Sequence, residues 1–63
     1  MRLIRKPALE EKVGYTERHI RDMEARGAFP KRLRPDPNGS SVAWIEEEID
    51  EWIAARAAER EAA

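Results

Sequence analysis

Apolar residues recur at helical spacing near the start of the sequence. Leu9 and Val13 lie four positions apart, hence on one face of a helix. Pro7 suits the first turn of such a helix, because the N–H that proline lacks has no intrahelical partner there. Gly14 follows and readily adopts the left-handed conformation that ends a helix. We predict a short helix over roughly residues 7–13.

A second helix is predicted from Thr16 to Arg26, with Ile20 and Met23 marking its buried side. The hydroxyl of Thr16 can cap the first turn by accepting a backbone N–H, and a glycine directly follows the last turn. Only three residues, the first of them glycine, separate the two helices. So short a turn is typical of a helix-turn-helix.

After the second helix the apolar period changes to two. Phe29 and Leu33 fall on one side of an extended segment, and Arg32 and Arg34 fall on the other. A cluster rich in proline, asparagine and glycine follows, and an apolar arm returns at residues 41–44. This pattern predicts a β-hairpin whose prolines limit strand pairing near the tip.

The helical period returns from about Ile45. Ile49 and Trp52 continue its apolar stripe, while Glu47 and Glu51 lie opposite. An alanine-rich stretch extends the helix beyond this stripe. The order helix, helix, hairpin, helix predicts a mostly α fold with a small β-hairpin, a winged helix-turn-helix, with residues 1–63 as a single domain.

The chain has 63 residues, which is near the lower limit for a domain that folds without disulfides or a metal. Charged residues make up 40% of it. The large apolar side chains nevertheless suffice for a thin core. The expected core residues are Leu3, Leu9, Val13, Ile20, Met23, Phe29, Leu33, Val42, Trp44, Ile49, Trp52 and Ile53.

Several classes of function lack their required residues. The chain has no cysteine and one histidine, so no nucleophile, base and orienting group occur together. His19 and Asp22 are two potential metal ligands without a third. We therefore expect no enzyme activity, no cofactor and no metal. No apolar run is long enough to cross a bilayer, and we expect no membrane partner and a cytoplasmic location.

The net charge of −1 conceals a strong asymmetry. Residues 1–34 hold ten Lys/Arg and five Asp/Glu, a net of +5, whereas residues 35–63 hold two and eight, a net of −6. A basic half beside an acidic half suggests a polyanionic partner approached from one side. Attraction between the two halves within the fold is an equally open explanation.

The second helix displays Arg18 and Arg21 opposite its apolar side. An α-helix fits the major groove of DNA, where guanidinium groups pair with guanine, and Lys and Arg on a wing can contact phosphates. A basic surface helix can equally be a solvated face. The predicted DNA-binding residues are Thr16, Glu17, Arg18, His19, Arg21 and Asp22 on the helix, and Arg5, Lys6, Lys31, Arg32 and Arg34 on the wing and backbone side.

Five segments together resemble a known family: Gly14-Tyr15-Thr16, Ile20, Gly27-Ala28-Phe29-Pro30-Lys31, Val42-Ala43-Trp44 and Glu48-Ile49-Asp50-Glu51-Trp52-Ile53-Ala54-Ala55-Arg56. With these segments the chain is similar to the AlpA-type phage regulators, which belong with excisionases in the MerR-like winged helix-turn-helix group. The resemblance implies a prophage DNA-binding protein, either a transcriptional regulator or a recombination directionality factor. It also implies a wing over residues 31–44 and a phage integrase as a partner.

We predict a sequence-specific double-stranded DNA-binding protein that associates with the nucleoid and self-associates cooperatively on DNA. Two other interpretations of the sequence remain open. The acidic C-terminal helix can dock a larger protein such as integrase or polymerase, or the chain can be the DNA-binding head of a packaging complex.

Overall fold

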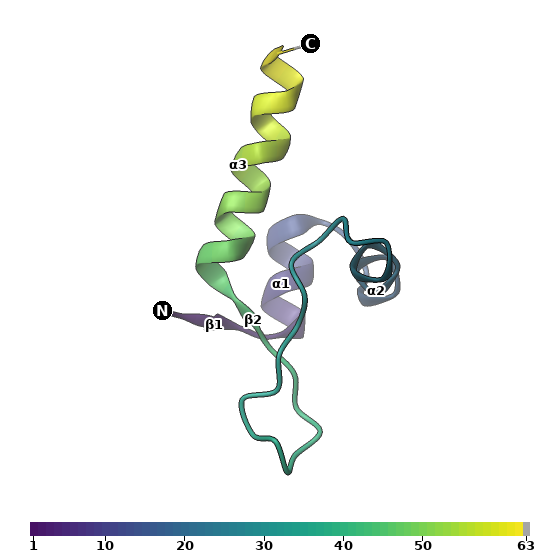
Figure 1. Ribbon diagram of the computed structural model, residues 1–63, viewed down its shortest axis with the longest axis vertical. Helices are drawn as coiled ribbons and strands as arrows, with labels where there is room; N and C mark the ends of the chain where they lie inside the picture. The colour runs from purple at the N-terminus through teal and green to yellow at the C-terminus, as the bar shows by residue number, and fades with distance from the viewer. Residues whose placement is uncertain (63) are drawn as a thin grey trace.

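Three helices and a two-stranded antiparallel sheet make up the fold in the computed structural model, which describes residues 1–62. The elements are β1 (Leu3–Ile4), α1 (Lys6–Val13), α2 (Glu17–Ala25), β2 (Trp44–Ile45) and α3 (Glu46–Ala62). The segment between α2 and β2 loops out away from the helices as a wing (Figure 1). The predicted fold class, a mostly helical winged helix-turn-helix with a small β element, is confirmed.

The turn between α1 and α2 follows from the glycine that ends α1. Gly14 has φ 79°, in the left-handed region, and its N–H donates to the carbonyl of Glu10 at 2.8 Å. Only Tyr15 and Thr16 then separate it from α2. The predicted helix-turn-helix is present, and α1 begins one residue earlier than expected, with Pro7 in its first turn.

Both ends of α2 are fixed by local hydrogen bonds. The hydroxyl of Thr16 accepts the N–H of His19 at 3.4 Å. At the other end Gly27 has φ 74°, and the N–H of Ala28 donates to the carbonyl of Met23 at 2.8 Å. This is the Schellman arrangement that closes a helix with glycine. The sequence therefore predicts both ends of α2 from capping residues alone.

The strand pairing differs in position from the prediction. The two-stranded ladder joins β1 to β2, with Leu3 opposite Ile45 and Ile4 opposite Trp44. The two arms of the wing meet in one isolated antiparallel bridge, between Leu33 and Ala43. The expected loss of pairing towards the proline-rich tip is therefore borne out, and the longer ladder forms with the N-terminus instead.

The core lies between α1, α2, α3 and the strands. Seven side chains form its buried cluster: Ile4, Leu9, Ile20, Met23, Phe29, Trp44 and Ile49. The expectation for Leu3 is wrong, since it is 44% exposed while Ile4 is buried. Successive strand residues point to opposite faces, so only one of these two neighbours can face inward.

The helix α3 contributes to the core only through its first half. The indole N–H of Trp52 donates to the carbonyl of Ala28 at 2.8 Å, and its ring meets Phe29 edge-on at 4.8 Å. Beyond this contact α3 extends away from the other elements, opposite to the wing (Figure 1). Within residues 1–62, no helix has the length and apolar character needed to cross a membrane.

Candidate nucleic-acid interface

The outward face of α2 carries exposed charged side chains. Ile20 and Met23 are buried on the inner face, and Arg18, Arg21 and Asp22 are exposed on the outer one. Arg18 makes no ion pair within residues 1–62. The sequence therefore predicted correctly which side of this helix faces solvent.

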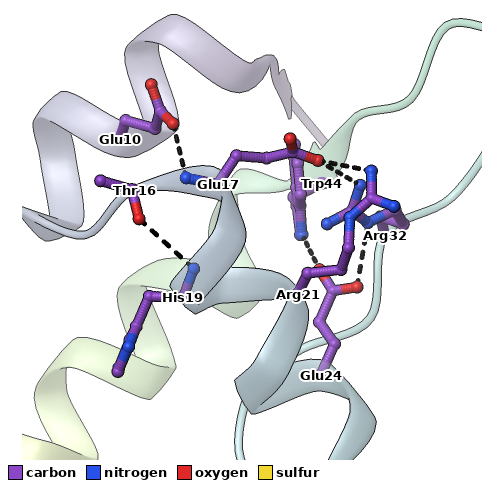
Figure 2. A network of polar contacts seen from close by, with 8 residues as sticks. All are labelled: Glu10, Thr16, Glu17, His19, Arg21, Glu24, Arg32 and Trp44. Atoms are coloured by element: carbon purple, nitrogen blue, oxygen red, sulfur yellow. Dashed lines mark hydrogen bonds and ion pairs between the residues drawn. The ribbon is translucent and has the colours of Figure 1, made fainter.

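Two contacts stabilise the first turn of α2. The N–H of Glu17 donates to a carboxylate oxygen of Glu10 at 2.6 Å, which ties α2 to α1 (Figure 2). A carboxylate at this place also suits the positive end of the helix dipole. His19 is exposed and stacks on the ring of Tyr15 at 4.5 Å. The contacts fix the start of the helix but leave its outer side open.

One carboxylate serves two arginines at the junction of α2 and the wing. Oε2 of Glu17 accepts from Nη2 of Arg21 at 2.8 Å and from Nη1 of Arg32 at 3.0 Å (Figure 2). The hydrogen bond from Arg21, followed by that from Arg32, lowers the pKa of Glu17 to about 2. Glu17 is therefore ionised at neutral pH and shared between helix and wing.

A second carboxylate holds the other side of Arg32. Nε of Arg32 donates to Glu24 at 2.9 Å, and the other oxygen of Glu24 accepts the indole N–H of Trp44 at 2.8 Å. The guanidinium also lies 4.9 Å from the centre of the Trp44 ring, within cation–π range. Burial alone lowers the pKa of Arg32, but the hydrogen bonds to Glu24 and Glu17 outweigh it and raise this pKa.

Arg32 therefore connects three parts of the fold. Its side chain is 19% exposed, and it joins the first arm of the wing to α2 and to β2. The sequence predicted a solvent-facing phosphate contact at this position. The structure shows a guanidinium already paired with two carboxylates, which makes it less accessible to a phosphate. Its contact with phosphate stays a prediction.

The other basic residues of the wing are more open. Lys31 and Arg34 are exposed and make no ion pair within the described chain. Arg34 lines a hollow of about 460 Å³ together with Arg21, Arg32, Leu33 and Val42. The tip turns back on Asp36, whose carboxylate accepts the N–H of Asn38 at 3.0 Å. The wing thus presents basic side chains near its base rather than at its tip.

Part of the basic N-terminal half pairs with the acidic helix. Nζ of Lys12 lies 3.1 Å from Glu46 and 2.7 Å from Asp50, and Nε of Arg2 lies 3.5 Å from Glu46. The hydrogen bond to Asp50, and then that to Glu46, raises the pKa of Lys12. Attraction between the two halves of the chain, which the sequence left open, is thus present.

Two predicted residues at the start of α1 are not part of these pairs. Arg5 and Lys6 are exposed and make no ion pair within residues 1–62. Together with Arg18, Lys31 and Arg34, they are predicted DNA contacts whose charge no carboxylate of the described chain neutralises. These five residues come from α1, α2 and the wing, so the fold itself decides which cations are available.

The role of Glu24 was not predicted from the sequence. This residue lies four positions after Ile20, on the side of α2 that faces the protein, and its side chain is 12% exposed. A carboxylate on a buried helix face needs hydrogen-bond donors. From this requirement a cationic partner such as Arg32 could have been predicted. No sequence feature near Glu24 indicates the indole of Trp44 as a second donor.

The fold and the exposed residues of α2 define a small winged helix-turn-helix protein whose second helix carries two arginines on its outer side. The family model for the prophage CP4-57 regulatory protein (AlpA) matches residues 2–57. The chain belongs to this family of prophage regulatory proteins. A search of curated proteins found no match.

Proposed function

We propose that this prophage regulatory protein acts by binding double-stranded DNA, with α2 in the major groove and the wing on the backbone. The observation that carries the proposal is the placement of Arg18 and Arg21, exposed on the outer side of a helix whose inner side is buried. An α-helix of this kind fits the major groove, and arginine pairs with O6 and N7 of guanine.

The order of the residues along α2 supports this orientation. Arg18 is the second residue of α2, and recognition helices contact bases mainly through their N-terminal residues. Thr16, His19 and Asp22 lie on or beside the same exposed side. Glu17 belongs to the predicted set as well, but its carboxylate is engaged by two arginines.

Phosphate contacts are assigned to the available cations around α2. Arg5, Lys6, Lys31 and Arg34 are exposed, whereas Arg32 is partly buried and already donates to Glu24 and Glu17. If four such residues each neutralise a phosphate, log K falls with log salt at a slope of about −3.6. Binding without base contacts would have the same salt dependence but no preferred sequence.

In the cell such binding serves one of two prophage activities. The protein regulates transcription, or it acts as an excisionase, a recombination directionality factor that binds attachment-site DNA and recruits integrase. Both roles place the protein on the bacterial nucleoid in the cytoplasm, and both favour cooperative self-association of so small a domain. An excision assay with purified integrase, with and without the protein, distinguishes them.

Selection from a pool of duplexes with a randomised central region tests the proposal. We expect enrichment of one sequence and tighter binding of that duplex than of the unselected pool. Arg18→Ala should weaken binding to the selected duplex by about 1–3 kcal/mol if the residue reads a base. Arg60→Ala, on the exposed end of α3, is the matched control and should bind as the wild type does.

Two results would contradict the proposal. Absence of enrichment at low salt would contradict sequence-specific binding. Equal affinity of wild type and Arg18→Ala for an enriched duplex would remove the assignment of α2 as the reading helix.

Docking of a larger protein on α3 is a second candidate function. It is favoured by one observation: the C-terminal half of α3 extends beyond the other elements (Figure 1). Glu48 and Glu51 are exposed on this helix and make no ion pair within residues 1–62. Crosslinking from α3 to integrase, with DNA binding retained, would support this function alongside the first.

A further inference from the structure

A hollow between α2 and the wing is lined by three arginines and two apolar residues. It has a volume of about 460 Å³ and is open to solvent. Its walls are Arg21 from α2 and Arg32, Leu33, Arg34 and Val42 from the wing. No carboxylate is among these lining residues, so the hollow combines three cations with two apolar side chains.

The hydrogen-bond donors of this site outnumber the acceptors that the fold supplies. A guanidinium has five N–H donors. Arg32 uses Nε and Nη1 on two carboxylates, while its Nη2 is buried and has no partner within the described residues. Arg21 donates to Glu17 alone and stays 69% exposed, and Arg34 makes no ion pair in residues 1–62.

Glu17 is the only anion that serves both Arg21 and Arg32 within residues 1–62. Its Oε2 atom lies 2.8 Å from Nη2 of Arg21 and 3.0 Å from Nη1 of Arg32 (Figure 2). Glu17 and Glu24 together balance the charges of Arg21 and Arg32, but no carboxylate within residues 1–62 pairs with Arg34. The junction therefore retains excess positive charge at neutral pH.

The guanidinium of Arg32 is also fixed before any ligand arrives. Glu24 accepts from its Nε, and its Cζ lies over the Trp44 ring, 4.9 Å from the ring centre. Planar, pre-oriented guanidinium groups match the oxygens of a phosphate better than mobile lysines do.

We propose that this hollow binds one phosphate group, with Arg21 and Arg34 as contact residues and Arg32 as the positioning residue behind them. The inference rests on the proposed function where the phosphate belongs to a duplex backbone. The same chemistry also accepts free inorganic phosphate, and the experiment separates the two sources. Arg18 and the bases that it contacts lie outside this assignment.

The test follows the side-chain Nε–Hε signals of the arginines in the ¹⁵N-labelled protein. Sodium phosphate is compared with sodium chloride at equal ionic strength, and a duplex is titrated separately. We expect saturable shifts of Arg21, Arg32 and Arg34, with Arg60 on α3 unchanged. The assignment is overturned if these three arginines respond to neither ligand, or if all arginines drift alike.

The two titrations also separate the pocket from the proposed function. Shifts with the duplex but not with inorganic phosphate assign the site to the DNA backbone. Shifts with inorganic phosphate in a protein that binds no duplex keep the pocket and remove the DNA-binding proposal.

A pair of matched variants completes the test without disturbing the fold. Arg34→Gln removes an exposed contact residue and should weaken duplex binding several-fold, with the salt slope reduced by about 0.9. Arg60→Gln makes the same chemical change outside the hollow and should leave both unchanged. Equal salt slopes for the two variants would overturn the pocket even if Arg18 proves essential for binding.

Discussion

Arg32 is the residue on which helix, wing and strand converge. Its guanidinium bonds to Glu17 and Glu24, and the second oxygen of Glu24 holds the indole of Trp44. Removing one member of a buried ionic network leaves the others desolvated without a partner. The positive charge of Arg32 therefore stabilises the position of the wing, with or without a bound ligand.

Arg32→Ala should lower the free energy of unfolding by about 2–3 kcal/mol. A fully buried pair loses about 3–5 kcal/mol when one partner is removed, and the side chain of Glu17, at 25% exposed, can rehydrate in part. Urea denaturation measures the change. Arg34→Ala is the control, since an exposed residue without such contacts should change stability by no more than about 0.5 kcal/mol. Equal losses in the two variants would contradict a structural role for Arg32.

Glu17 gives stability a specific dependence on acid pH. Its pKa in the folded protein is about 2, below the ordinary value of 4.5 expected in the unfolded chain. The folded state therefore binds this proton less readily, and the contribution of Glu17 is complete above pH 4.5 and lost as pH falls towards 2.

Over this range the melting temperature of the wild type should fall more steeply than that of Glu17→Gln. Thermal melts followed by circular dichroism between pH 2 and 5 measure both curves. Other carboxylates titrate in both proteins, so the difference between the curves isolates Glu17. Parallel curves would show that its bonds to Arg21 and Arg32 are absent in solution.

At the scale of elements, α2 depends on its ends because few of its side chains are buried. Ile20 and Met23 are its only buried residues. The cap from Thr16, the bond from Glu17 to Glu10 and the glycine at residue 27 supply what the core does not. A helix stabilised at its ends can leave a whole side free for a ligand.

Gly27→Ala should destabilise the protein by about 1–2 kcal/mol, the cost of a left-handed conformation for a residue with Cβ. No atom lies within 4 Å of the position that this Cβ would take, so the loss is backbone strain and not a clash. Gly27→Asn is the comparison, because asparagine tolerates the left-handed region better. If thermal melts show no loss for alanine, the end of α2 is not fixed as described.

Elements with local signals could be predicted from the sequence, and contacts between distant segments could not. Thr16, Gly14 and Gly27 mark helix ends through their own chemistry. The pairing of Ile4 with Trp44 joins segments 40 residues apart through a strand of two residues, which is too short to show a period. The position of Glu24 on the inner face of α2 indicates that its carboxylate needs a donor, but that the donors are Arg32 and Trp44 depends on the assembled fold.

On the scale of the whole molecule, the fold sorts the cations into two groups. Arg2 and Lys12 form ion pairs with carboxylates of α3, whereas Arg18 and Arg34 form no ion pair within residues 1–62. The wing and the end of α3 extend in opposite directions along the longest dimension, which is 44 Å (Figure 1). A polyanion approaching α2 and the wing therefore does not meet the C-terminal half of α3.

Titration of the ¹⁵N-labelled protein with the selected duplex, followed in its amide spectrum, is the most direct test of this arrangement. We predict that the largest shifts fall on residues 16–34, with residues 54–61 of α3 unaffected and with all shifts diminishing at high salt. Shifts confined to α3, with residues 16–34 unmoved, would contradict the claim that α2 and the wing form the surface that binds DNA.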